Sequence, residues 1–439
     1  MITITKNFKK KLIILYLFSR LVIYLSPPPH FSEITYSYMP YAHLWESGET
    51  PYLKQWYEYP PATIPLFYAP HLVDKYTWGH LWHLNYAQAY KMMLIAVDLG
   101  VFALIWKTLH KLKVRPNVFL LGIIYYILAT TKANHYLYDS MDLVFGAAIT
   151  LGVAAPILWR ENTGRFFSWL GYFLAVALKY VNAPLGFLYA LLDLKHLSSY
   201  VPSPIHRRGD LGVRLCRLVI LASLALFLVW GLPLAYFRSS LLVSFEYHKQ
   251  RGLQIDSMAA SLVRFANAFT HSEVAVERYK NYDLVGPLSS QALRVLNLAF
   301  PAGIAAFLIL GTYLIVKSKK FNFKNSGVLK LDLTLGYVIL FMLIGKVLST
   351  PFLLWQIPLL SIYPFRNNRE QLKFLIPSSL IILMSMSPWP DIKLLGFMSL
   401  HTVFVNLRWI LFTFMFISWW QLKRSQEIAI DQSHRNKFE

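Results

Sequence analysis

The residues best suited to catalysis or ligand binding lie in two long polar stretches that interrupt an otherwise apolar chain. In the second stretch, His248, Lys249 and Arg251 fall within four residues of one another. Such a group can hold a phosphate, because arginine offers a bidentate fork and lysine a point charge. A solvated polar loop has the same composition, since short charged segments are common in loops. Both interpretations stay open on this pattern alone.

The first polar stretch is dense in tyrosine, tryptophan and proline. Residues 33–46 predict a short helix in the membrane interface, with Tyr36, Met39 and Trp45 facing lipid. An aromatic belt explains most of these side chains, because tryptophan and tyrosine favour that depth. It does not explain the acidic residues, which outnumber the two lysines of the stretch: Glu33, Glu46, Glu49, Glu58 and Asp74.

Long apolar segments have to position these two stretches. Of the 439 residues, 56% are hydrophobic and 15% are charged, whereas soluble domains carry about 25% charged residues. The single cysteine, Cys216, excludes a disulfide scaffold within the chain. About twelve segments have the length and composition of membrane spans: 8–25, 90–108, 116–131, 142–158, 166–180, 181–194, 214–236, 290–316, 331–348, 351–364, 373–388 and 395–420.

The sequence therefore predicts an all-α, polytopic transmembrane protein with one membrane domain over residues 1–439. Two long loops, 26–89 and 237–287, are expected on one side of the membrane, and loops this long are usually functional. The segment 351–364 is short and rich in proline and polar residues, which indicates a broken or re-entrant helix. The first span lacks a small-residue cleavage site and is expected to be a retained anchor.

The distribution of charge predicts the orientation. The formal net charge is +21. With the N-terminus inside and the sides alternating, the inner segments hold 27 basic and 7 acidic residues, and the outer ones 12 basic and 13 acidic. The positive-inside rule then places both termini in the cytoplasm and the two long loops outside a cytoplasmic membrane. The basic excess is expected to contact anionic lipids, and no nucleic-acid partner is expected.

Three segments of the chain follow one another as they do in a known family. They are Tyr41-Ala42…Gly48…Pro51-Tyr52…Tyr59-Pro60-Pro61, Arg251-Gly252-Leu253-Gln254-Ile255-Asp256-Ser257 and Lys346-Val347-Leu348-Ser349-Thr350-Pro351-Phe352-Leu353-Leu354-Trp355. Together they resemble glycosyltransferase family 87. Family members usually carry an aspartate just after the first span, where this chain has Glu33, and Thr350-Pro351-Phe352 stands in place of their Pro-Gln-Tyr.

The resemblance implies a GT-C fold and a membrane glycosyltransferase. Such an enzyme moves a sugar, mannose or a similar one, from a polyprenyl-phosphate donor to an acceptor hydroxyl of a glycan or glycolipid at the outer face. Glu33 is then the expected catalytic base, because the attacking hydroxyl has to lose its proton. No cofactor is expected beyond the lipid-linked sugar substrate, and no metal, because no tight cluster of hard oxygen ligands is evident.

Four cations are expected to hold the donor phosphate, which gains charge as its bond to the sugar breaks: Arg251, His248, Lys346 and Lys179. Lys346 closes an apolar span, where a lone charge is usually functional, although a lysine near a helix end also snorkels to the interface. Lys179, followed by Pro184, matches a lysine that the family places before a proline.

The residues expected to bind substrate are Tyr36, Tyr57, Glu58, Tyr59, Gln254, Asp256, Asp139 and Trp355. For Asp139 and the nearby Asp142, three roles stay open: binding sugar, holding a cation, or pairing with Lys132. Arg20 lies inside the first span, where we expect it to snorkel or to pair with a buried acid such as Asp98.

Two other functions fit the same pattern. A polytopic transporter or lipid flippase would also have about twelve spans and a basic inner face, but it should place ionisable groups near the midplane on broken helices. A non-catalytic scaffold would use the aromatic first loop as a docking surface. Most of the candidate groups lie in the two outer loops, which favours the enzyme.

Overall fold

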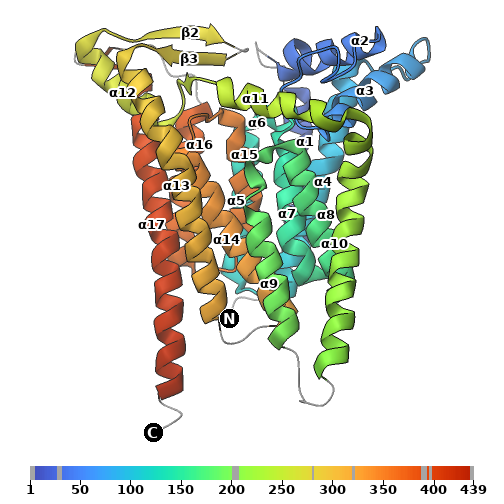
Figure 1. Ribbon diagram of the computed structural model, residues 1–439, viewed down its shortest axis with the longest axis vertical. Coiled ribbons are helices and arrows are strands. Elements are labelled where there is room, and N and C mark those ends of the chain that lie inside the picture. Colours follow the sequence, from blue (N-terminus) through green and yellow to red (C-terminus); the bar gives the residue numbers. More distant parts are fainter. Residues whose placement is uncertain are drawn as a thin grey trace. The chain divides into compact units, whose positions relative to one another are not determined.

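The computed structural model describes residues 5–26, 32–199, 207–278, 281–318, 322–386, 393–394 and 398–435. These residues are almost entirely helical, with a few short strands (Figure 1). They divide into two compact units. Unit 1 comprises Met1–Arg251, Ile304–Thr334 and Pro351–Pro364, and unit 2 comprises Gly252–Gly303, Leu335–Thr350 and Phe365–Glu439.

Unit 1 is a helical bundle. Its elements are α1 (Lys6–Leu25), the π-helix η1 (Ile34–Tyr38), α2 (Met39–Glu46), α3 (Thr63–Thr77), α4 (Tyr86–Leu112), α5 (Pro116–Lys132), α6 (Asn134–Leu137), α7 (Asp142–Leu158), α8 (Glu161–Leu178), η2 (Tyr180–Asn182), α9 (Leu185–Ser199), α10 (Arg207–Phe237), η3 (Arg238–Leu241), α11 (Leu242–Gln250) and α15 (Leu353–Ile362). The short elements α2, α3, α6 and α11 gather at one end of the long helices of this unit (Figure 1).

Unit 2 combines helices with a small antiparallel sheet. It contains β1 (Leu253–Gln254), α12 (Met258–Thr270), β2 (Val274–Arg278), β3 (Asn281–Val285), α16 (Asn368–Met386), β4 (Lys393–Leu394), β5 (Met398–Ser399) and α17 (Leu400–Arg435). The sheet order is β1-β3-β2, with Leu253 opposite Leu284. Two helices, α13 (Pro287–Lys317) and α14 (Phe323–Ile344), contribute residues to both units. The short helix η4 (Thr350–Phe352) does so as well, with Thr350 in unit 2 and the rest in unit 1.

Among the described residues, five helical stretches are long and apolar enough to cross a membrane: Tyr86–Leu112, Leu211–Gln250, Pro287–Lys317, Phe323–Ile344 and Val403–Lys423. Two further stretches, Asp142–Leu158 and Thr350–Ile362, are apolar but shorter. The predicted helical fold is confirmed, and these helices are consistent with a membrane protein. The count of twelve crossings stays a prediction. The segment expected to be broken begins as the 3-10 helix η4 and continues as the short α15.

Helix boundaries in unit 1 follow from local sequence signals. A capping box starts α4, because the Asn85 side chain accepts from the backbone of Gln88 and the Gln88 side chain accepts from the backbone of Asn85. The helix ends at Lys113, which adopts a left-handed conformation with φ 54°. Pro116 then occupies the first turn of α5, where its missing N–H costs little.

Two glycines let α8 and α15 approach α7 closely. A Cβ on Gly171 of α8 would lie 2.5 Å from the backbone nitrogen of Gly152, and one on Gly146 would lie 2.8 Å from the carbonyl oxygen of Leu354. Larger residues at these positions would push the helices apart. This packing brings the end of α8 and the first turn of α15 to the start of α7, where Asp142 lies.

A buried ion pair ties α1 to α4. Arg20 Nε lies 2.7 Å from the carboxylate of Asp98, which is fully buried. Asp98 also accepts from the hydroxyls of Tyr16, Tyr126 and Tyr138, at 2.8, 2.5 and 3.0 Å. Of the two roles expected for Arg20, snorkelling or pairing with a buried acid such as Asp98, the structure shows the pair with Asp98. Because Tyr138 directly precedes Asp139, this cluster also anchors the segment between α6 and α7.

Removing one partner of this pair should destabilise the bundle. Asp98→Asn leaves the Arg20 charge buried without its carboxylate, and such a break typically costs about 3–5 kcal/mol. We expect a clearly lower melting temperature in detergent. The double variant Arg20→Met/Asp98→Asn should recover part of the loss, because no charge is then buried and the asparagine oxygen can still accept from the tyrosine hydroxyls. A single variant that melts with the wild type would contradict this role.

Candidate functional site

The π-helix η1 sets the position of Glu33. In a π-helix, residues five apart come together, and here the Tyr38 hydroxyl donates a hydrogen bond to the Glu33 carboxylate. The Tyr38 hydroxyl also accepts from the backbone N–H of Met141, at 3.3 Å. Tyr38 is fully buried, so one side chain links the carboxylate after α1 to the start of α7.

Asp139 holds the backbone on which Glu33 sits. Its carboxylate accepts the backbone N–H of Glu33 at 2.7 Å, and it also accepts from the Ser32 hydroxyl. Asp139 is buried. The two segments that meet here are 106 residues apart in sequence, so Glu33 is held from its backbone by Asp139 and from its side chain by Tyr38.

The carboxylate of Asp142 is held by three side chains. Lys179 Nζ lies 2.7 Å away, Trp355 Nε1 donates at 2.5 Å, and the Ser140 hydroxyl donates at 2.8 Å. Lys179 also lies over the rings of Phe352 and Trp355, 4.1 and 5.0 Å from their centroids. Of the roles left open for Asp142, pairing with a lysine holds, but the partner is Lys179 from the end of α8. The proposed pairing with Lys132 is wrong, because α8 packs so closely on α7.

These surroundings give Glu33 an unusual protonation equilibrium. Burial raises the pKa of the Glu33 carboxyl to about 7, and the negative charges of Asp142 and Asp139 add to the rise. The hydrogen bond from Tyr38 and the charge of Lys179 oppose it. A carboxylate with a pKa near the working pH can accept a proton from a hydroxyl and return it to water.

The pKa of Asp139 is raised as well. Burial is the main cause, opposed by the hydrogen bonds from Ser32 and the backbone of Glu33 and by the charge of Lys91. With Asp142, the site therefore gathers three carboxylates, and the ammonium groups of Lys179 and Lys91 offset part of their charge. This balance favours neutral hydroxyl groups over a phosphate in the immediate surroundings of Glu33.

An aromatic wall made from the first loop lies next to Glu33. Tyr59 interacts electrostatically with both Glu33 and Glu58, and the Tyr41 hydroxyl donates to Glu58. Tyr57 is fully buried, and its hydroxyl lies 2.6 Å from that of Thr63. Tyr36 is 59% exposed, residues 33–46 contain η1 and α2, and the lipid-facing side expected of them stays a prediction.

The predicted phosphate cations of the second loop lie in unit 1, on and just after α11. Tyr180, the residue after Lys179, holds α11 in place. Its hydroxyl lies 2.7 Å from that of Ser244, and its ring stacks on that of Phe245 with the centroids 3.8 Å apart. His248, which is exposed, makes an edge contact with Tyr180.

The guanidinium of the buried Arg251 lies over the Tyr247 ring, 5.7 Å from its centroid. Tyr247 in turn interacts electrostatically with Tyr59. Tyr59 thus interacts with both Glu33 and Tyr247, and that Glu33 and the His248–Arg251 stretch act in one site stays a prediction.

Three further predicted residues belong to unit 2. The backbone N–H of Gln254 donates to the carbonyl oxygen of Lys346 at 3.1 Å, and Gln254 is buried. Asp256 lies 3.6 Å from Arg408 of α17. The structure thus brings Gln254 and Lys346 together, and the participation of all three residues in the site of Glu33 stays a prediction.

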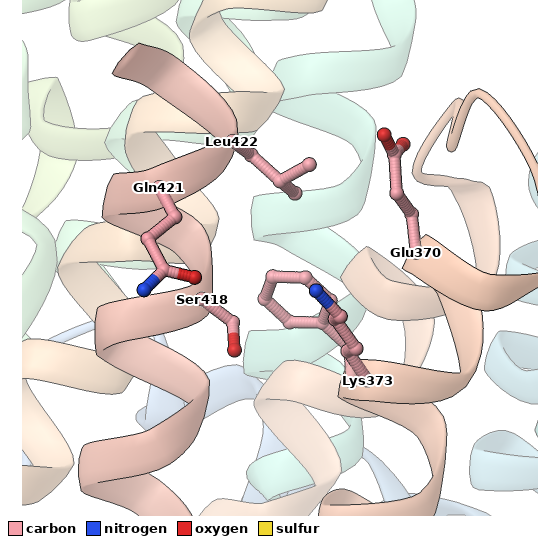
Figure 2. Close-up of a pocket in the computed structure, with 6 residues that line it drawn as sticks. Glu370, Lys373, Ser418, Gln421 and Leu422 are labelled. Carbon is pink, nitrogen blue, oxygen red and sulfur yellow. The ribbon is translucent and has the colours of Figure 1, made fainter. Parts of the chain in front are cut away.

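A separate hollow of about 180 Å³ lies in unit 2, between α16 and α17. Figure 2 shows the side chains that line it, Glu370, Lys373, Ser418, Gln421 and Leu422, together with Phe374. None of these residues belongs to the candidate site in unit 1, and the hollow carries no part of the chemistry considered for Glu33.

Sequence reasoning did not identify Tyr38 or Tyr90 as site residues. Tyr38 is five residues after Glu33, but a π-turn has no strong sequence signal.

In comparisons with known proteins, no family model matches this chain, and no curated protein sequence matches it. The site therefore has to be interpreted from its own geometry.

Removing the Tyr38 hydroxyl should raise the pKa of Glu33 further. The hydrogen bond favours the charged carboxylate, so in Tyr38→Phe the carboxyl should titrate above the wild-type value of about 7. Infrared titration of the purified protein can follow this carboxyl band, and Glu33→Gln, which should lack it, identifies the signal. The same midpoint in Tyr38→Phe and wild type would show that this hydrogen bond does not set the equilibrium.

Proposed function

We propose that the protein is a membrane glycosyltransferase that moves mannose or a similar sugar from a polyprenyl phosphate to an acceptor hydroxyl. The observation that carries the proposal is Glu33, a carboxylate with a pKa near 7 held by Tyr38 and Asp139. The resemblance of three segments to glycosyltransferase family 87 supports it, because the family expects an acid at this place.

The reaction would be a single displacement. The acceptor oxygen attacks the anomeric carbon and passes its proton to Glu33, while the bond between that carbon and the phosphate oxygen breaks. The leaving polyprenyl phosphate keeps the electron pair of the broken bond. An attack from the side opposite the leaving group inverts the configuration of the sugar. Glu33 contributes by taking the proton as the new bond forms, a role typically worth 10²–10⁴-fold in rate.

The charges around Glu33 suggest that different cations hold the carboxylates and bind the phosphate. Lys179 is 2.7 Å from Asp142 and its charge also acts on Glu33, so we assign it to holding Asp142 and lowering the pKa of Glu33. The leaving phosphate is better matched by Arg251 and His248. Arginine can bind phosphate through two parallel hydrogen bonds. Lys346 of unit 2 is a further predicted cation for this role.

The proposal includes the predicted topology. Twelve crossings would place both termini in the cytoplasm and the end of unit 1 that carries Glu33 on the outer side, where a lipid-linked donor and a glycan or glycolipid acceptor can meet. The positive-inside pattern of the sequence supports this orientation. The substrates are then a lipid-linked sugar, which needs access from the bilayer, and an acceptor approaching from water.

A transporter or lipid flippase is the alternative, and buried ion pairs in the helices of unit 1 are the observation that favours it. Lys330 and Asp193 are both fully buried and lie 3.0 Å apart. Such groups within spans are often functional. Lys330 also interacts with Ser168, and Asp193 with Trp169, which suits a fixed structural pair. Robust substrate flux in proteoliposomes without product formation would favour the transporter.

Replacing Glu33 by glutamine should abolish sugar transfer. We expect at least a 100-fold loss in a polyprenyl-phosphate-sugar assay, because glutamine cannot accept the proton. Folding should be preserved. The pKa of Glu33 is raised to about 7 in the folded protein, so any contribution of its protonated form to stability is lost as the pH rises through about 7. Above that pH, the variant should melt no lower than wild type. Glu49→Gln, in an exposed position of the same loop, is the matched control. Near-wild-type turnover by Glu33→Gln refutes the assignment.

The pH dependence of transfer should report the same group. Below about 7, Glu33 is increasingly protonated and cannot act as a base, so kcat/KM should fall about tenfold for each pH unit well below that value. Above it, the rate constant should level off. Initial rates between pH 5.5 and 8.5 in buffers of constant ionic strength would measure this, and a flat profile through 7 would contradict the role of Glu33.

A further inference from the structure

The hydroxyl of Tyr90 is buried without a hydrogen-bond partner among the described residues. Tyr90 lies in α4 and is fully buried, and its oxygen makes no hydrogen bond to any residue of the described ranges. One turn earlier, the hydroxyl of Tyr86 donates to the carbonyl oxygen of Phe67 at 2.9 Å. An unsatisfied buried hydroxyl is destabilising, and native proteins contain few of them. Tyr90 therefore requires an explanation that Tyr86 does not.

The neighbours of Tyr90 are the groups of the candidate site. Its ring centroid lies 5.3 Å from that of Tyr38, whose hydroxyl holds Glu33. Glu33, Asp139 and Asp142 all interact electrostatically with Tyr90. The unsatisfied hydroxyl is thus close enough to all three carboxylates to interact with their charges, and its ring packs against the tyrosine that holds Glu33.

The carboxylates around Tyr90 already have other donors. Asp139 accepts from Ser32 and from the backbone of Glu33. Asp142 accepts from Trp355 and Ser140 and pairs with Lys179. A phosphate is a poor match for this acidic surrounding. A neutral hydroxyl suits it, because a tyrosine hydroxyl can both donate to and accept from an alcohol.

We propose that the Tyr90 hydroxyl binds a hydroxyl group of the sugar or of the acceptor and so positions it beside Glu33. The chemical class of the ligand rests on the proposed function. The presence of a buried, unsatisfied hydroxyl near the carboxylates does not depend on it. Tyr90 would be a binding residue, with Glu33 as the only proton acceptor.

Tyr90→Phe and Tyr86→Phe form a matched pair that tests this role. Tyr90→Phe removes a hydroxyl without a partner, so its melting temperature without substrate should equal or exceed that of wild type. Tyr86→Phe loses a hydrogen bond and should melt lower. In the transfer assay with polyprenyl-phosphate mannose, we expect Tyr90→Phe to raise the KM of one substrate about tenfold, the effect of one lost hydrogen bond, with kcat within about twofold. Tyr86→Phe should leave that KM unchanged.

Two results would overturn the inference. One is an unchanged KM for both substrates in Tyr90→Phe, measured alongside an active wild type. The other is a melting temperature of Tyr90→Phe that falls as far as that of Tyr86→Phe, because the hydroxyl would then be structural. A wild-type protein that transfers no sugar overturns the proposed function instead, and the melting comparison still decides whether the hydroxyl of Tyr90 is structural.

Discussion

The hydrogen bond from the backbone of Glu33 to the carboxylate of Asp139, 2.7 Å long, is the contact on which the candidate site depends. It joins the segment after α1 to the segment before α7, and the link from Tyr38 to Met141 reinforces it. Asp139 is in turn kept in place by its neighbour Tyr138, which is bound to the buried Arg20–Asp98 pair. A charge cluster inside the bundle thus determines where the proposed base lies.

Buried charges in unit 1 are compensated to different degrees, and this difference gives the site its character. Asp98 faces a guanidinium and three tyrosine hydroxyls, and Asp142 faces an ammonium, an indole N–H and a hydroxyl. Glu33 has the Tyr38 hydroxyl and lies near two other carboxylates. Burial with weak compensation shifts the equilibrium of a carboxyl towards its protonated form. The same arrangement that costs stability above neutral pH makes Glu33 suited to proton transfer.

Close helix packing places an acidic group, around Asp142, and a basic group, around Arg251, at this end of unit 1. The approach of α8 and α15 to α7, allowed by Gly171 and Gly146, gathers Lys179 and Trp355 around Asp142. The helix α11 holds His248 against Tyr180, and Arg251, just after the helix, lies over Tyr247, which interacts with Tyr59 of the aromatic wall. An acidic centre suits hydroxyl groups and a cationic margin suits a phosphate, which are the two kinds of group that sugar transfer from a lipid phosphate brings together.

The helical class was predictable from the order of residues alone, because runs of apolar residues and their boundary signals act over a single segment. Helical structure at 33–46 and the short segment beginning near residue 351 were predictable in this way, whereas for Arg20 the sequence left snorkelling and pairing with Asp98 both open, and only the packing of α1 on α4 decided for the pair. Tertiary structure alone decided that Lys179, and not Lys132, meets Asp142, that a π-turn returns Tyr38 to Glu33, and that Tyr90 lies unsatisfied beside them. Burial, proton affinity and pairing arise from neighbours that can be more than 100 residues away along the chain, and no local pattern of residue types records which distant helices will pack together.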